Sequence, residues 1–256
     1  MILIDGDIML YNSIHKTSIN VEFDGEWIGP YLDLRQARAR IDLYVKGLQE
    51  KLDDKGDHKV VVAWSDHDGC FRHDIDPSYK QNRTGKKPGG WFELESYVDG
   101  VYHTERMPLL EADDVLGILA TQKANRGSII VSDDKDLQTI PSTLYRPRQG
   151  ELLNVTTKEA DLYHLQQALE GDRVDDYPGC PGVGAVGAKR LLAPLLEEPR
   201  WIRAAKLRAW DTVVAAFEKK GLTEQDALVQ ARLARILRSS EWDDKTRKPL
   251  PWNPGQ

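Results

Sequence analysis

The sequence has 256 residues, of which 30% are charged, and a formal net charge of −6. This length allows one large or two smaller domains with a substantial core, and the charge excludes a globally basic protein, so that any nucleic-acid binding must come from local basic groups. The two cysteines, Cys70 and Cys180, give neither a disulfide framework nor zinc-ligand spacing. No apolar run approaches membrane-spanning length, and the aspartate at position 5 is incompatible with a signal peptide, so we expect a soluble, intracellular protein with no membrane partner.

Three short apolar runs each end in a carboxylate. Residues 2–4 lead into Asp5, residues 60–64 into Asp66, and residues 129–131 into Asp134 and Asp136. Unbroken apolar runs of this length are typical of parallel strands buried on both faces. Because ligands of open parallel sheets bind beyond the carboxyl ends of the strands, these four aspartates are predicted to converge at one edge of a sheet. The role of Asp7, close behind the first strand, is left open.

A second group of carboxylates precedes a predicted helix at about residues 112–123. Glu111, Asp113 and Asp114 would repel one another unless burial raised their pKa values or a cation compensated them. A hard divalent metal is the usual cation for clustered oxygens. The alternative is that these residues only stabilise the helix N-terminus.

The alternation of strands and helices stops near residue 155. A hairpin or loop at residues 18–29 and a crossover helix at residues 34–52 precede the second strand, and two short strands flank the turn at Gln149 and Gly150. The pattern predicts an α/β fold with a central, mostly parallel sheet over residues 1–155. Residues 156–256 are predicted to form a helical region, with helices at about 158–169, 201–220 and 224–238 and a loosely ordered tail from residue 249.

Basic and aromatic residues alternate between residues 76 and 92. Lys80 and Arg83 are spaced i, i+3, so that on a helix they share one face and could hold one phosphate, and Lys86 and Lys87 follow beside Trp91. Such a mixture suits a phosphate backbone and unstacked bases. A solvated loop with several lysines is the alternative.

A glycine-rich stretch lies between two predicted helices at about residues 172–195. Glycines free the backbone N–H groups to approach a phosphate, and the next helix offers its positive end. This predicts a helix-hairpin-helix that contacts a duplex backbone without reading bases, against the alternative of a tight helical turn. The predicted contact residues are Gly182, Gly184, Gly187, Lys189 and Arg190. Asp172 and Asp175, spaced i, i+3 before it, complete the acidic cluster unless they only belong to an Asp-rich loop.

Together these motifs resemble the flap endonuclease and 5′ nuclease (PIN-like) superfamily, and most closely the 5′-3′ exonucleases of T7-type bacteriophages. The resemblance covers nearly the whole chain. It is carried by Leu3-Ile4-Asp5-Gly6-Asp7, Asp76-Pro77-Ser78-Tyr79-Lys80-Gln81-Asn82-Arg83, Leu110-Glu111-Ala112-Asp113-Asp114-Val115, Ser132-Asp133-Asp134-Lys135-Asp136 and Ala231-Arg232-Leu233-Ala234-Arg235-Ile236-Leu237-Arg238. Any one of these motifs is weak, but five in the same order are specific.

The resemblance implies a PIN-like nuclease core with a short basic arch at about residues 77–105, followed by the duplex-binding hairpin. It implies that Lys80 and Arg83 touch the scissile phosphate and that two Mg²⁺ or Mn²⁺ ions are held directly or through water. It also implies that the hairpin can hold K⁺. The implied metal ligands are Asp5, Asp66, Glu111, Asp113, Asp114, Asp134, Asp136, Asp172 and Asp175.

The expected activity is hydrolysis of duplex DNA from a 5′ end by a two-metal mechanism. RNA–DNA hybrids and 5′ flaps are further candidate substrates, replication proteins are candidate partners, and the host cytoplasm is the expected location if a phage encodes the protein. One alternative is a haloacid-dehalogenase-like phosphatase with Asp5 as nucleophile, although that leaves residues 111–114 and the hairpin unexplained. Another is a DNA-binding scaffold without catalysis.

Overall fold

The computed structural model describes residues 1–53, 59–83 and 85–255, apart from the side chains of Phe23 and Trp27. Within them, six strands form one sheet in the order β5-β4-β1-β6-β7-β8, parallel except for β8, which pairs antiparallel with β7. The strands are β1 (Ile2–Asp5), β4 (Val60–Trp64), β5 (His103–Arg106), β6 (Ile129–Val131), β7 (Thr143–Arg146) and β8 (Glu151–Asn154). The three strands predicted to end in carboxylates therefore lie side by side, as the sequence indicated.

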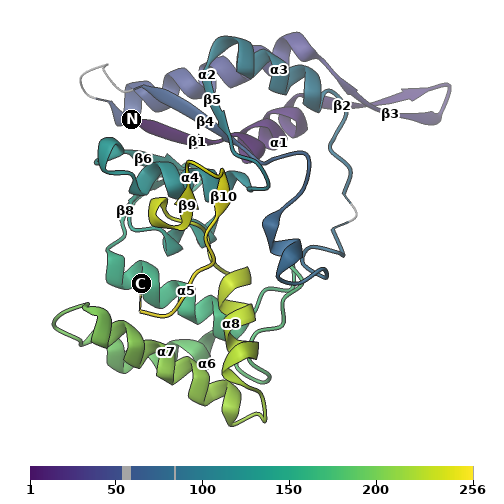
Figure 1. Cartoon of the computed structure of the whole chain (residues 1–256). Coiled ribbons are helices and arrows are strands. Elements are labelled where there is room, and N and C mark those ends of the chain that lie inside the picture. The colour runs from purple at the N-terminus through teal and green to yellow at the C-terminus, as the bar shows by residue number, and fades with distance from the viewer. Residues whose placement is uncertain (54–58, 84, 256) are drawn as a thin grey trace.

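Alternate residues of the central strands face two separate cores. Ile2 and Ile4 pack among α1 (Gly6–Thr17), α2 (Leu34–Leu52) and α3 (Trp91–Val101), whereas Leu3 packs against α4 (Ala112–Thr121). In Figure 1 these helices cover opposite faces of the sheet. The expected fold class, a mostly parallel sheet flanked by helices, is confirmed.

The remaining helices form a second body below the sheet in Figure 1. Their buried apolar side chains make a core of their own, which also includes Trp252. They are α5 (Thr157–Glu170), α6 (Ala185–Leu196), α7 (Arg203–Glu218) and α8 (Glu224–Leu233). The chain after α8 returns to the sheet, where Ile236, Leu237 and Trp242 pack in the core beside α4. Helix α5 begins at Thr157, two residues after the predicted boundary, and the C-terminal region contributes to both cores.

Short elements complete the described chain. β2 and β3 form an antiparallel hairpin that projects from the end of α1 in Figure 1, with Asp24 and Gly25 at positive φ in its turn. The short elements are β2 (Ser18–Phe23), β3 (Glu26–Leu32), η1 (Phe71–Asp74), η2 (Lys123–Asn125), η3 (Lys135–Thr139), η4 (Ser239–Glu241), β9 (Trp242–Asp243) and β10 (Lys248–Pro249). None of the described helices is long and apolar enough to cross a membrane.

Three expectations about local structure were wrong. The helix expected at about residues 224–238 ends at Leu233, because the chain after it turns back to pack beside α4. The basic arch does not reach residue 105, because residues 91–101 form α3, whose Trp91, Leu94 and Val98 are buried in the core, and β5 pairs with β4 at the sheet edge. The tail from residue 249 is not loose throughout, because Trp252 is buried and its ring lies 5.0 Å from that of His164. Thr84, within the expected arch, and Gln256, in the tail, lie outside the described residues.

Candidate active site

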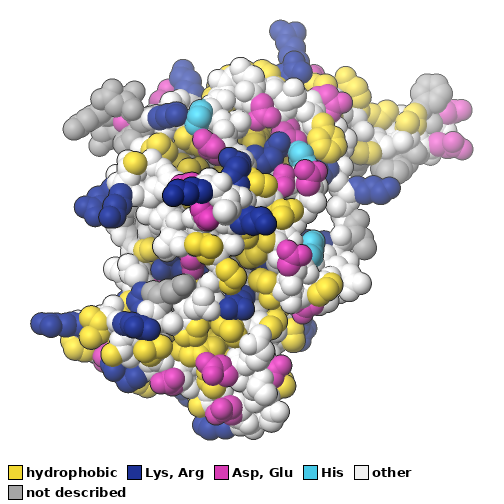
Figure 2. Space-filling view, in the orientation of Figure 1, with side chains coloured by type: hydrophobic (Ala, Val, Ile, Leu, Met, Phe, Trp, Pro, Cys, Tyr) yellow, Lys and Arg dark blue, Asp and Glu magenta, His cyan; other side chains and the backbone are white. Residues whose placement is uncertain are grey.

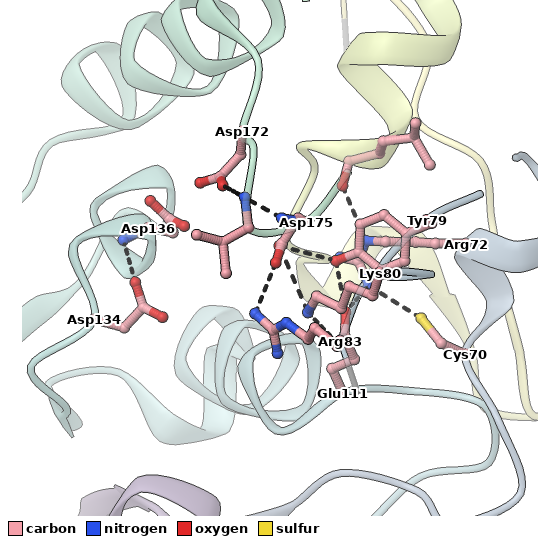
Figure 3. A network of polar contacts seen from close by, with 12 residues as sticks. Cys70, Arg72, Tyr79, Lys80, Arg83, Glu111, Asp134, Asp136, Asp172 and Asp175 are labelled. Atoms are coloured by element: carbon pink, nitrogen blue, oxygen red, sulfur yellow. Dashed lines mark hydrogen bonds and ion pairs between the residues drawn. The ribbon is translucent and has the colours of Figure 1, made fainter. Parts of the chain in front are cut away.

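An acidic pocket opens beyond the carboxyl ends of the central strands. It encloses about 320 Å³ and is lined from six parts of the chain: the end of β1 with the start of α1, Ser65 after β4, the turn at 80–83, the start of α4, η3 with the residue before it, and the loop at 172–175. Its charged lining residues are Asp5, Asp7, Lys80, Arg83, Glu111, Asp113, Asp134, Lys135, Asp136, Asp172 and Asp175. Nine of the predicted site residues are among them, and Figure 3 shows several facing one another across the pocket.

Asp5 is held at the end of β1 by two hydrogen bonds. One carboxylate oxygen caps α1 by accepting from the N–H of Ile8 at 3.0 Å, and the other accepts from the hydroxyl of Ser132, which follows β6, at 2.9 Å. Because β1 and β6 are parallel neighbours, the sheet register brings these two residues together. Burial, together with the charge of Asp7, raises the pKa of Asp5 to about 7.

Asp113 and Asp136 both lie close enough to Asp134 for its charge to raise their pKa values. Burial raises the pKa of Asp113 well above its usual range, and the charges of Asp134 and Asp5 add to the effect. Burial, and then the charge of Asp134, raises the pKa of Asp136 to about 7. One oxygen of Asp136 accepts from the side-chain amide of Gln167 on α5 at 2.6 Å. On this side of the pocket, burial and the neighbouring carboxylates thus outweigh the nearby ammonium of Lys135, which lies 4.0 Å from Asp136.

The opposite side of the pocket is already neutralised by the protein itself. Lys80 forms an ion pair with Glu111 and lies 3.5 Å from a carboxylate oxygen of Asp175, while Arg83 donates to the other oxygen of Asp175 at 2.7 Å. Although burial alone would raise it, the pKa of Glu111 is lowered to about 2 by the charges of Lys80 and Arg72. Burial alone would lower the pKa of Lys80, but the negative charges of Glu111 and Asp175 outweigh the effect of burial and raise this pKa. Figure 3 shows this cluster on the right of the pocket and Asp134, Asp136 and Asp172 on the left.

Asp114 does not take part in the pocket, which corrects the expectation that it is a metal ligand. Its side chain is fully buried, and its two oxygens accept from the guanidinium of Arg72 at 2.7 and 2.8 Å. They also accept from the backbone N–H groups of Leu237 and Glu111. Arg72 donates in addition to Glu111 at 3.0 Å and to the backbone carbonyls of Leu233 and Arg235. Asp114 and Arg72 are thus a buried brace that joins α4 to the C-terminal segment behind Glu111.

Asp66 also lies outside the residues that line the pocket. Its oxygens accept from the backbone N–H groups of Leu109 at 2.7 Å and His67 at 3.0 Å, so that it orders the loop that leads to Glu111. Lys86 and Lys87 are exposed and do not line the pocket either. The ammonium of Lys87 lies over the rings of Trp91 and Phe92, at 4.7 and 5.5 Å from their centroids.

Lys80 and Arg83 both line the pocket, but they do not do so from one face of a helix, as the sequence indicated. Residues 77–82 form turns instead of a helix, and Lys80 has a positive φ of 54°. Tyr79, which sequence reasoning did not single out, supports the pair: its hydroxyl lies 3.0 Å from Glu111 and 3.2 Å from Asp175. Gln167 was also missed, because nothing local marks a glutamine on α5 as a neighbour of Asp136.

The predicted duplex-contact residues surround the start of α6. Gly182 has a φ of 74°, which favours glycine, and Gly184 is the N-cap residue. The first N–H bonded within the helix is that of Ala188, which donates to Gly184 at 2.9 Å, so that the N–H groups of residues 185–187 are left for other acceptors. Lys189 and Arg190 are exposed beyond them. On the face in Figure 2, Lys and Arg are interspersed with Asp and Glu, and this face carries no continuous basic surface.

The chemistry of the pocket fits divalent cations. All its acidic groups offer hard carboxylate oxygens, and burial together with neighbouring carboxylates raises the pKa values of Asp5 and Asp136. As they stand, however, the described residues contain no group of three or more His, Cys, Asp or Glu side chains set to hold a metal ion. Lys80 and Arg83 take the oxygens of Glu111 and Asp175 instead.

Comparison with known proteins decides the family. Residues 1–166 match the family model described as 5′-3′ exonuclease, N-terminal resolvase-like domain. The chain belongs to this family. It is 28% identical over 283 aligned positions to the exodeoxyribonuclease of Enterobacteria phage T3 and to the exonuclease of Escherichia phage T7, in each case covering 99% of this chain and 93% of the relative.

Solved structures show the same fold. A phage T5 5′-exonuclease with bound divalent metal ions (zinc) matches with a TM-score of 0.60 and 14% identity, over 91% of this chain and 93% of that one. The catalytic core of Rad2 in complex with a DNA substrate matches with a TM-score of 0.51 and 11% identity, over 98% and 82%. The family match and the named exonuclease relatives do not favour the phosphatase or the non-catalytic scaffold.

Proposed function

We propose that this protein is a divalent-metal-dependent 5′-3′ exonuclease that hydrolyses phosphodiester bonds of duplex DNA. The observation that carries the proposal is the convergence of carboxylates from β1, α4, η3 and the 172–175 loop on one pocket that also contains Lys80 and Arg83. The family model, described as 5′-3′ exonuclease, supports the direction of the reaction. The T3 and T7 relatives, which are named as exonucleases and align over 93% of their length, support its class.

Seven carboxylates of the pocket are the proposed holders of two Mg²⁺ or Mn²⁺ ions: Asp5, Glu111, Asp113, Asp134, Asp136, Asp172 and Asp175. When bound, such ions activate the attacking water and offset the charge that develops on the phosphate. Asp66 orders the neighbouring loop, and Asp114 braces Glu111 from behind.

Lys80 and Arg83 are the proposed catalytic cations. In the structure Lys80 forms an ion pair with Glu111 and Arg83 forms one with Asp175, within the pocket where a scissile phosphate would enter. A phosphate competes for these donors, and their charge stabilises a transition state that is more negative than the ground state. The same two carboxylates become free to hold a cation once the donors turn to the phosphate.

The start of α6 is the proposed contact with the duplex away from the cut. Free N–H groups at residues 185–187 and the positive end of the helix suit a phosphate, and Lys189 and Arg190 add charge that does not depend on sequence. Carbonyl groups of the preceding turn, around Gly182 and Gly184, are the proposed site for K⁺. Lys86 and Lys87, exposed beside the arch, are proposed to contact the strand that enters the pocket.

The test is product analysis on duplex DNA labelled at either the 5′ or the 3′ end, with Mg²⁺ and with EDTA. We expect mononucleotides or short fragments from the 5′ label in Mg²⁺ alone. A label left intact under all conditions would refute the proposal. Blunt, gapped, 5′-flap and RNA–DNA hybrid substrates in the same assay rank the substrate structures, and phage-infected host cytoplasm is where we expect the enzyme to act.

A further inference from the structure

A second set of contacts, made by backbone groups and by Asn82 and Asp176, ties the basic turn to the loop before α6 at the rim of the pocket. The backbone N–H of Lys80 donates to the carbonyl of Asp175 at 3.0 Å. The backbone N–H of Asn82 donates to one carboxylate oxygen of Asp176 at 2.8 Å, and its side-chain amide donates to the other at 2.6 Å. These three hydrogen bonds, here called the clasp, join segments more than 90 residues apart in sequence.

The two sides of the clasp differ in how firmly they are built. The loop side is closed on itself, because Asp172 and Tyr177 exchange backbone hydrogen bonds at 2.8 and 3.1 Å and Tyr177 is buried. Asp176 therefore sits on a fixed base. On the other side, Asn82 and Arg83 are exposed, as are residues 85–87, so the turn has little packing of its own beyond Tyr79.

The two segments that the clasp joins each contain a residue with an uncommon backbone conformation. Lys80 and Asp176 both have positive φ, at 54° and 58°. Residues with side chains adopt this region rarely and keep it only where surrounding contacts impose it. Here one such residue lies on each side of the clasp, beside the hydrogen bonds that join the two segments.

This inference rests on the proposed function, in which Lys80 and Arg83 bind the substrate during catalysis and the turn must then be held by other contacts. In the structure the turn is held partly by the ion pairs of Lys80 and Arg83 with Glu111 and Asp175. Those side chains cannot hold the turn in this way and also bind a phosphate. When they turn to the substrate, the clasp remains, because neither Asn82 nor Asp176 lines the pocket.

We infer that Asn82 and Asp176 are a positioning pair that keeps Lys80 and Arg83 over the pocket while their charged ends are bound to the substrate. Neither residue touches the reacting groups. The pair acts through the backbone between Lys80 and Arg83, which Asn82 anchors from within the turn.

The experiment compares Asn82→Ala, Asp176→Ala and the double variant in steady-state cleavage of a 5′-labelled duplex with Mg²⁺. We expect kcat to fall 10- to 100-fold in each single variant, because displacements of about 1 Å reduce rates on that scale. KM and the melting temperature should stay near wild type, because the clasp is exposed and makes no contact to the distant duplex site. Asn82→Ala removes only the side-chain hydrogen bond, whereas Asp176→Ala removes both, so the double variant should lose no more than Asp176→Ala alone.

Two further variants separate positioning from a general structural role. Gln81→Ala changes the exposed neighbour of Asn82 and should leave kcat unchanged. Asp176→Asn keeps one acceptor and should recover part of kcat. Additive losses in the double variant, an equal loss in Gln81→Ala, or a fall in melting temperature that parallels kcat would overturn the inference. An active wild type with unaffected clasp variants refutes the clasp alone, whereas a wild type that cuts no DNA refutes the proposed function.

Discussion

Replacing Asp136 with asparagine tests whether the pocket carries uncompensated negative charge. Asparagine keeps the size of the side chain and can still accept from Gln167. Burial and the charge of Asp134 raise the pKa of Asp136 to about 7, from 3.8. Below about pH 4 the carboxyl is neutral in both the folded and the unfolded chain. Between pH 4 and 7 the folded chain binds the extra proton, so the stability of the wild type falls as pH rises, and above pH 7 the loss is complete.

The size of the effect follows from the shift. About three pKa units at 1.36 kcal/mol each correspond to about 4 kcal/mol of unfolding free energy. The side chain is 24% exposed, so this figure is an upper limit. In EDTA, Asp136→Asn should therefore be more stable than wild type by about 2–4 kcal/mol at pH 8, and by about 1–2 kcal/mol at pH 5, because only the part of the shift below pH 5 then counts.

Urea unfolding of the metal-free protein at several pH values measures this difference. Asp211→Asn, a change at an exposed position on α7, is the matched control and should show no such pH-dependent gain. Mg²⁺ should reverse the order by stabilising the wild type more than the variant, which lacks one proposed ligand. A difference between variant and wild type that is the same at pH 5 and pH 8 would refute the reasoning.

Three other substitutions address separate parts of the account. Asp134→Ala should abolish cleavage in Mg²⁺ while duplex binding, measured by fluorescence anisotropy in Ca²⁺, persists; measurable turnover would remove Asp134 from the metal site. Lys189→Ala should weaken binding to all duplex sequences alike and lower the slope of log K against log salt by about one, whereas Lys123→Ala, remote from α6, should not change the slope. Arg72→Met should destabilise the fold by about 3–5 kcal/mol in chemical unfolding, because Asp114 is left as an unpaired buried charge. A loss below about 1 kcal/mol would show that Asp114 does not depend on Arg72.

The sequence was most informative where local pattern and topology agree. Apolar runs that end in Asp5 and in Asp134 had to be parallel neighbours for their carboxylates to meet, and β1 and β6 do pair in register. Helix α2 has the bounds that its apolar spacing predicted, from Leu34 to Leu52. In these segments burial on both faces or on one stripe leaves a periodic record in the sequence.

Other features left a weaker record. The arch was expected to extend to about residue 105, yet Gly90, with a φ of 81°, is the N-cap of α3, and the i, i+3, i+7 spacing of Trp91, Leu94 and Val98 was the available signal. β5 lies at the sheet edge and is largely polar, so it lacks the apolar run of a central strand.

Within the acidic motif, sequence could not tell which carboxylates face the pocket. Asp113 and Asp114 are adjacent on α4, and one helical step of about 100° turns the second toward the core. Its partner, Arg72, lies 42 residues earlier and has no local signature. The contacts of Gln167 with Asp136, and of Asn82 with Asp176, likewise depend on tertiary packing between distant segments.

Crystals of the protein soaked in Mn²⁺ and measured at the manganese absorption edge test the central claim most directly. The account predicts anomalous peaks inside the pocket, within direct coordination distance of carboxylate oxygens that include those of Asp5, Asp113, Asp134 or Asp136. The peaks should vanish or weaken strongly in Asp134→Ala. Peaks confined to other surfaces of the molecule, with the pocket empty at Mn²⁺ concentrations that support cleavage, would contradict it.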